Sequence, residues 1–179
     1  MSPDRRALLR AALLSGGLAL TGSAAVWAEG VDRVLAAGDD AALLGTLATL
    51  EDSAVKVLGT TGTALSRAPL PGYAQSFLSH HRAHRDALLT ALHGLGAPSP
   101  PAAPSPAPAP AGEAGVLAVL MEIEDRLLGA QYAALAALER PSLRIQVASI
   151  LGVDARHAAV WRAASGLDPV PTSFVGSQR

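Results

Sequence analysis

The stretch APSPPAAPSPAPAPAG at residues 97–112 decides the fold, because it divides the chain into two helical halves. Seven of its sixteen residues are proline, which excludes a helix and favours an extended polyproline II conformation. At about 3.1 Å per residue, such a segment reaches on the order of 50 Å. A helix of about 25 residues is only about 37 Å long. The segment can therefore run the whole length of a helical bundle.

On each side of this segment, apolar residues recur at the spacing of an amphipathic helix. The prolines near 67–72 and 139–142 divide each half into two helices, and Pro141 is expected to open the last one. The four helices are predicted near 40–66, 72–95, 113–139 and 142–165. Their apolar faces include Leu47 and Leu58, Tyr73 and Phe77, Leu120 and Leu128, and Ile150 and Trp161. The sequence predicts an all-α four-helix bundle, with two antiparallel helix pairs joined by the long Pro/Ala-rich crossover.

Composition excludes several classes of function. The chain has 179 residues, no Cys and a formal net charge of −1, and only 3% of its residues are aromatic. The absence of Cys excludes disulfides, thiolate zinc sites and iron–sulfur clusters. The charge and the scarcity of aromatic rings give no basis for nucleic-acid binding.

Residues 1–28 have the pattern of an export signal. Arg5, Arg6 and Arg10 precede a short apolar stretch, and the small-x-small sequence Val26-Trp27-Ala28 precedes Glu29. The paired arginines indicate the twin-arginine route. The sequence predicts an exported protein, located in the periplasm, at the cell envelope or outside the cell, with a folded domain over 29–179. No stable membrane span is expected after the signal is removed, although an uncleaved N-terminal anchor stays open.

Each apolar face is interrupted by polar residues. The helix near 40–66 carries Glu51 in the middle of its face, and the helix near 113–139 carries Glu124. The other two helices each carry a pair of residues three positions apart, which project from the same side of a helix. These pairs are His81 and His84, and Asp154 and His157. All six side chains are therefore expected to point into one interior.

The spacing of these residues repeats. A shift of 73 positions places Glu51 on Glu124, His81 on Asp154 and His84 on His157. The same shift places Leu65 on Leu138, Arg67 on Arg140 and Leu70 on Leu143. The pattern predicts an internal repeat with a pseudo-two-fold axis through a central site.

Buried charges are normally paired or bound to metal, because an unpaired carboxylate in an apolar core costs several kcal/mol. Carboxylates and imidazoles are ligands that iron, manganese and zinc accept. The sequence therefore predicts that metal ions bind in the middle of the bundle. A hydrogen-bonded network without metal is the alternative explanation of the same six residues.

The pattern resembles that of exported bacterial ferritin-like proteins, which are four-helix bundles with a di-metal carboxylate site. The stretch SILGVDARHAAVWR (149–162) is similar to their last helix, IEDRLLGAQY (123–132) to their third and HRAHRDAL (81–88) to their second. The resemblance covers roughly 40–175 and implies six metal ligands: Glu51, His81, His84, Glu124, Asp154 and His157. His81 and Asp154 depart from it, since that family usually has Glu at both positions. The change to His leaves three negative charges, so one ion or a weakly held pair becomes an alternative to two.

The resemblance implies iron as the cofactor, di-iron or mononuclear, with manganese as an alternative, and oxidation of iron or reaction with O2 or peroxide. The chain would then be a metal-dependent oxidoreductase. Two alternative hypotheses remain: a non-enzymatic bundle for stress protection, structure or partner binding, and a mononuclear zinc hydrolase. Metal ions are the expected partners, and the sequence leaves homodimerisation open.

Overall fold

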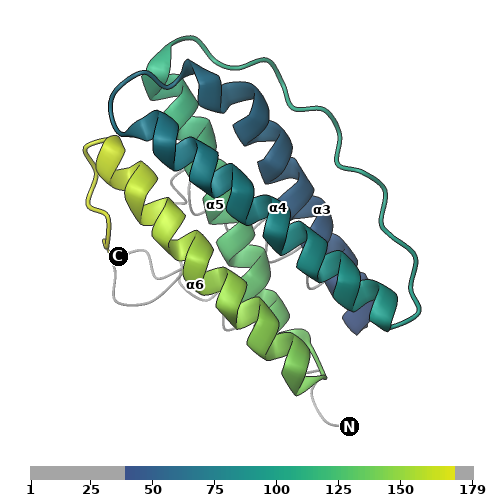
Figure 1. The fold of residues 1–179 in the computed structure, drawn as a ribbon. Coiled ribbons are helices and arrows are strands. Elements are labelled where there is room, and N and C mark those ends of the chain that lie inside the picture. The colour runs from purple at the N-terminus through teal and green to yellow at the C-terminus, as the bar shows by residue number, and fades with distance from the viewer. Residues whose placement is uncertain (1–38, 172–179) are drawn as a thin grey trace, which may run out of the picture.

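The computed structural model describes residues 39–171 and shows four helices in two antiparallel pairs (Figure 1). The helices are α3 (Asp40–Thr61), α4 (Leu70–Gly94), α5 (Gly112–Ala137) and α6 (Pro141–Ala164), with a 3-10 turn, η1 (Gly62–Ala64), after α3. No strand occurs within this range. The predicted all-α four-helix bundle is confirmed. The expected export signal at 1–28 lies outside the described residues.

The helix ends follow local sequence signals. The side chain of Asp39 accepts a hydrogen bond from the backbone N–H of Ala42 at 2.9 Å, which satisfies one free donor at the start of α3. Pro141 opens α6, as expected, because its missing N–H is not needed in a first turn. Gly112 has φ +76°, a conformation that glycine adopts readily, and it starts α5. None of the described helices is both long and apolar enough to cross a membrane.

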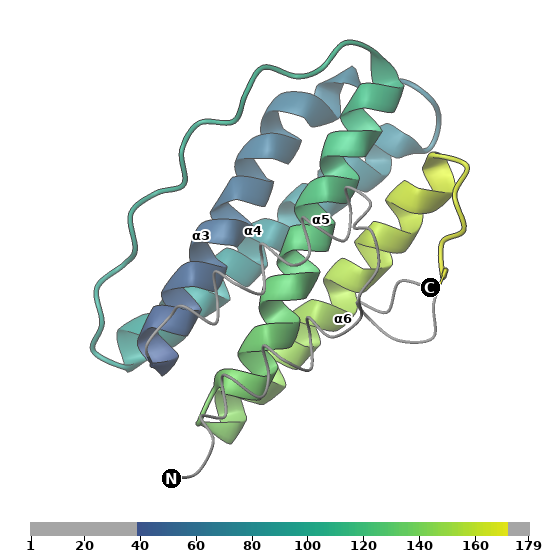
Figure 2. The same ribbon diagram turned by 180° about the vertical axis from the view of Figure 1, so that it is seen from behind.

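The crossover between α4 and α5 runs along the outside of α3 from one end of the bundle to the other (Figures 1 and 2). It is held at Ala103, which is 4% exposed. The N–H of Ala103 donates to the Asp52 carboxylate at 3.0 Å, and its carbonyl accepts from the Lys56 ammonium. Because the crossover returns the chain to the opposite end, α4 and α5 run in the same direction (Figure 1).

The core forms two apolar clusters at different levels along the bundle. On α4, Phe77 belongs to one cluster and Leu88 to the other, and His81 and His84 lie between them in the helix. Of the eight apolar residues named above for these faces, all but one are buried. Tyr73, in the first turn of α4, is 40% exposed and stacks on Phe77 with 5.9 Å between ring centroids. Tyr73 lies near one end of the bundle, where its ring is only partly covered.

Each half of the chain caps the turn of the other half. The Glu113 carboxylate, in the first turn of α5, accepts from the backbone N–H groups of Ser66 and Arg67 at 2.9 and 3.0 Å. The Asp40 carboxylate, in the first turn of α3, accepts from the backbone N–H groups of Glu139 and Arg140 at 2.8 and 3.3 Å. Adding 73 to 40, 66 and 67 gives 113, 139 and 140, so the two contacts occupy equivalent positions.

Candidate metal centre

The six residues singled out by the sequence come together between the two apolar clusters. Glu51 projects from α3, Glu124 from α5, and each of the other two helices supplies a pair of residues one turn apart. Five of the six are at most 1% exposed, and the side chain of His84 is 12% exposed. They form two overlapping groups of four that could each hold an ion: Glu51, His81, His84 and Asp154; and His81, Glu124, Asp154 and His157.

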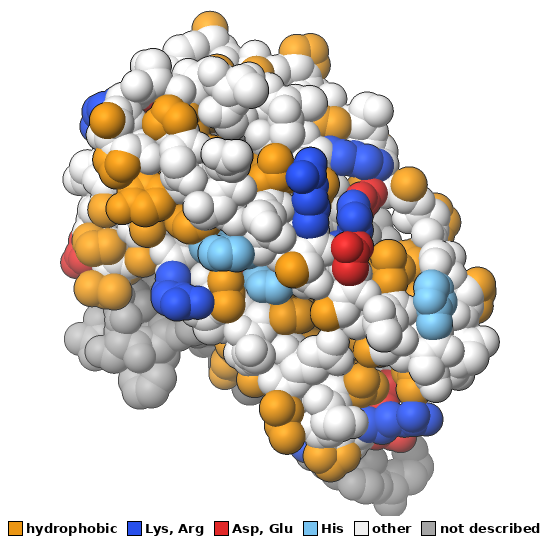
Figure 3. All heavy atoms as spheres, in the orientation of Figure 1, with side chains coloured by type: hydrophobic (Ala, Val, Ile, Leu, Met, Phe, Trp, Pro, Cys, Tyr) orange, Lys and Arg blue, Asp and Glu red, His pale blue; other side chains and the backbone are white. Residues whose placement is uncertain are grey.

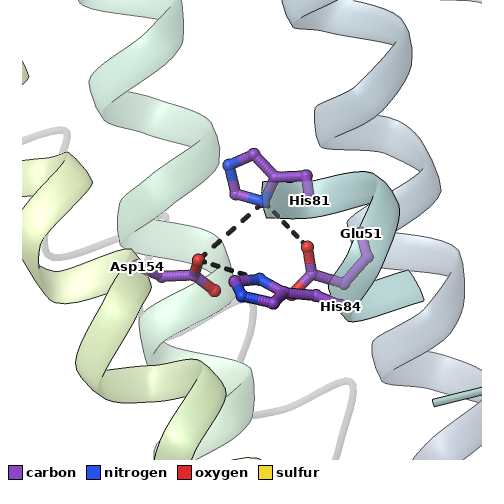
Figure 4. A group of neighbouring side chains, drawn as sticks. All are labelled: Glu51, His81, His84 and Asp154. Atoms are coloured by element: carbon purple, nitrogen blue, oxygen red, sulfur yellow. Dashed lines mark hydrogen bonds and ion pairs between the residues drawn. The ribbon is translucent and has the colours of Figure 1, made fainter. Parts of the chain in front are cut away.

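The first group surrounds the space between α3, α4 and α6, where its four side chains point toward one another (Figure 4). His81 Nδ1 lies 2.8 Å from Glu51 Oε2 and 3.9 Å from Asp154 Oδ1. His84 Nδ1 lies 3.3 Å from Asp154 Oδ1 and 3.7 Å from Glu51 Oε1. The shorter side chain of Asp154 therefore still reaches the centre of this group.

The second group uses the other nitrogen of His81. Its Nε2 atom lies 3.3 Å from Glu124 Oε1. His157 Nδ1 lies 3.5 Å from Glu124 Oε1 and 3.5 Å from Asp154 Oδ1. The ring of His157 stacks on Phe77, with 3.8 Å between ring centroids, which fixes the plane of the imidazole.

Exchanging the two halves of the chain converts one group into the other. The shift of 73 positions carries Glu51 to Glu124 and His84 to His157, while His81 and Asp154 change places. The residues shared by both groups are therefore the two that depart from the family pattern. Each group also contains residues from both halves of the chain.

The charges of the cluster stabilise one another. Burial alone would raise the pKa of Glu51 and of Glu124, but hydrogen bonds and positive charge from neighbouring histidines lower both below 4.5. Burial opposes the histidine cations, yet nearby carboxylates raise the pKa of His81 well above 6.5 and that of His84 to about 9. Burial and the charges of Glu51 and Glu124 raise the pKa of Asp154 to about 6. Protons on His81 and His84 therefore balance the carboxylates when no metal is bound.

Four polar atoms of the cluster are buried without a hydrogen-bond partner: His84 Nδ1, Glu124 Oε2, Asp154 Oδ1 and His157 Nδ1. Such atoms are rare in folded proteins, and a binding site for an ion is one recognised cause. All four belong to the two groups, and nitrogen and carboxylate oxygen donors suit iron, manganese or zinc. The residues present therefore fit a metal centre.

Sequence reasoning missed two residues that contact these groups. Gln131 on α5 is 1% exposed, and its amide donates to Asp154 Oδ2 at 2.6 Å and to Glu51 Oε1 at 3.3 Å. Its position seven residues after Glu124 places it on the same helix face, which is a sequence signal that could have identified it. His80 is exposed, and its Nδ1 atom lies 3.0 Å from His157 Nε2.

Comparison with known proteins supports the fold. A family model described as a ferritin-like domain matches residues 48–167. A crystal structure of a conserved hypothetical protein, rv2844, from Mycobacterium tuberculosis is similar, with a TM-score of 0.63 and 22% identity over 70% of this chain and 96% of that chain. No curated protein matches the chain. At this identity the solved structure bears on the fold alone.

Proposed function

This chain belongs to the ferritin-like domain family, and from that premise we propose that it binds iron or manganese ions in the cluster between its four helices. The observation that carries the proposal is the set of four buried atoms without a hydrogen bond, on His84, Glu124, Asp154 and His157. A buried polar group without a hydrogen bond costs about 1–3 kcal/mol, and metal coordination would reduce that cost. Glu51 and His81 complete the donor set.

The function we infer is oxidation of ferrous iron, or reaction with O2 or peroxide, in an exported protein. A bound redox metal would supply the electrons for this chemistry. The chain's own residues bind and orient the ions and keep bulk water out, since five of the six ligands are at most 1% exposed. The exposed side of the cluster lies at α4, where histidine side chains reach the surface (Figure 3). His80 is exposed and the His84 side chain is 12% exposed, so this is the side from which a small oxidant would approach.

The internal repeat is part of the same proposal. The reciprocal caps made by Asp40 and Glu113, and the exchange of the two ligand groups under a shift of 73, support a pseudo-two-fold centre. The arginine pair and the small-x-small sequence at 26–28 support export through the twin-arginine route. That route carries folded proteins, which suits a centre that is loaded before export.

A non-enzymatic bundle is the second candidate, and one observation favours it. His81 contacts carboxylates through both ring nitrogens, at 2.8 and 3.3 Å, so a protonated ring would neutralise the middle of the cluster without metal. In that case the cluster is a buried hydrogen-bonded network, and the chain has a structural or partner-binding role.

Metal analysis of the mature protein, purified from the organism that makes it, separates the two candidates. Stoichiometric iron or manganese that is missing from Glu51→Ala and His157→Ala supports the metal centre. Absence of metal, together with unchanged stability in both variants, supports the structural bundle. Tight zinc binding, with no visible absorption after ferrous iron is added in air, would instead support a mononuclear zinc site. His93→Ala is the matched control, because His93 bonds to Ser99 at 2.8 Å and lies in the last turn of α4, away from the cluster.

A further inference from the structure

Both ring nitrogens of His81 face ligands, and they face different groups. Nδ1 lies 2.8 Å from Glu51 Oε2 in the first group, and Nε2 lies 3.3 Å from Glu124 Oε1 in the second. His157 differs, since only its Nδ1 atom faces the cluster and its Nε2 atom contacts His80. The ring of His81, which is 0% exposed, therefore separates the two candidate ion positions.

The other shared residue is poorly placed to join two ions through both of its oxygens. Asp154 Oδ2 accepts a hydrogen bond from Gln131 at 2.6 Å. The contacts that Asp154 makes with the histidines all use Oδ1, which lies 3.3 Å from His84 Nδ1 and 3.5 Å from His157 Nδ1. A carboxylate bridge that uses one oxygen for each ion would therefore require the Asp154 carboxylate to turn from the orientation that the bond to Gln131 holds.

Among the six candidate ligands, only His81 faces both groups with nitrogen, Nδ1 toward Glu51 and Nε2 toward Glu124. A ring that binds metal through both nitrogens releases the proton of each nitrogen to the solvent.

Resting on the proposed metal function, we propose that His81 bridges two metal ions, binding one through Nδ1 together with Glu51 and His84 and the other through Nε2 together with Glu124 and His157. Binding exchanges protons for metal and transfers no electron. Metal–nitrogen bonds of about 2.0–2.1 Å on opposite sides of one ring place the two ions roughly 6 Å apart. Carboxylate-bridged pairs lie closer, at about 3.5–4 Å.

The separation of two cobalt ions in the full chain tests this proposal. The protein is loaded with Co²⁺ alone and examined by X-ray absorption and by anomalous diffraction. We expect two ions per chain, roughly 6 Å apart, with no metal neighbour at about 3.5–4 Å. A separation of about 3.5–4 Å, or only one ion per chain at saturation, would overturn the bridge while leaving the metal function intact. Binding of no metal at all would instead overturn the proposed function.

The His81→Glu variant tests whether the His81 ring sets the distance between the ions, because it introduces the residue type that the family usually has. We expect it to bind two Co²⁺ ions with their separation reduced to about 3.5–4 Å. An unchanged separation in His81→Glu would show that the ring does not set the distance. His93→Ala is expected to keep the wild-type separation, and circular dichroism shows whether each variant remains helical. The wild-type measurement decides the proposal even where a variant does not fold.

Discussion

The Nε2 atom of the buried His157 lies 3.0 Å from the Nδ1 atom of the exposed His80. The contact engages the ring nitrogen of His157 that faces away from the cluster and leaves Nδ1 facing Glu124 and Asp154, each at 3.5 Å. A bond of this kind fixes the tautomer and the orientation of a metal-binding imidazole. His80 therefore acts on the candidate centre through His157, without belonging to either ligand group.

Replacing His80 with alanine should weaken metal binding without removing a ligand. We expect affinity for Co²⁺ to fall by about 10–100-fold, because His157 loses the partner that orients its ring. Isothermal titration calorimetry measures the change. His80→Asn keeps a hydrogen-bond acceptor near the same place and should retain most of the affinity. Equal losses in His80→Ala and His80→Asn would contradict an orienting role.

Removing one outer histidine should empty one ion position selectively. His84 belongs only to the first ligand group and His157 only to the second. His84→Ala and His157→Ala should therefore each bind one ion tightly and the other weakly, whereas the wild type should bind both. Metal-to-protein ratios after dialysis, with anomalous diffraction to locate the remaining ion, provide the measurement. Loss of both ions from each variant would show that the two positions are not separable.

The stability of the metal-free protein should fall as pH rises through the alkaline range. Carboxylates raise the pKa of His84 from 6.5 to about 9, so its contribution is fully present below about pH 6.5 and is lost as pH rises through 9. Asp154 has the same sign at lower pH, because its pKa is raised from 3.8 to about 6 and the fold favours its protonated form. Tm of the chelator-treated protein should be lower at about pH 9.5 than at about pH 6.5. The dependence should be weaker in His84→Ala, and a Tm that rises over this interval would contradict the assignment.

Gln131 should contribute to stability through Asp154. Gln131→Leu leaves Asp154 Oδ2 without its 2.6 Å hydrogen bond, and we expect the free energy of unfolding to fall by about 1–3 kcal/mol. Leu58, 73 residues earlier, occupies the equivalent position and is 3% exposed. The conservative Leu58→Met change is the control and should cost less than about 1.5 kcal/mol. Urea denaturation of the metal-free proteins measures both values, and equal effects would argue against the hydrogen bond as the cause.

Much of the fold could be predicted from the sequence because its apolar faces and its prolines act locally. Pro141 marked the start of α6, and the predicted helix ends match the observed ones to within two residues except at the end of the first, where α3 stops at Thr61 and a 3-10 turn follows. The proline-rich crossover was evident from composition, but its attachment was not. Asp52 and Lys56 bind the backbone of Ala103. Because these contacts use the backbone, the residue type at position 103 does not indicate them.

The convergence of the six polar residues was also predictable, because each interrupts an apolar face at a similar height along the bundle. Their division into two groups could not be predicted, since it depends on how α4 and α6 are aligned across the bundle. That alignment places Asp154 against His84 at 3.3 Å and allows both groups to share His81. The role of His80 depends on the orientation of the His157 ring, which stacks on Phe77. Such details arise from packing between helices rather than from the pattern along one of them.

None of the six candidate ligands lies in the crossover, which links the two helical hairpins that supply them. The proposed centre needs candidate ligands from both hairpins. Joining the hairpins in one chain turns a bimolecular encounter into an intramolecular one. Supplied as separate pieces, the hairpins would have to find each other against dilution before any ion could be held. The crossover makes assembly of the centre independent of protein concentration.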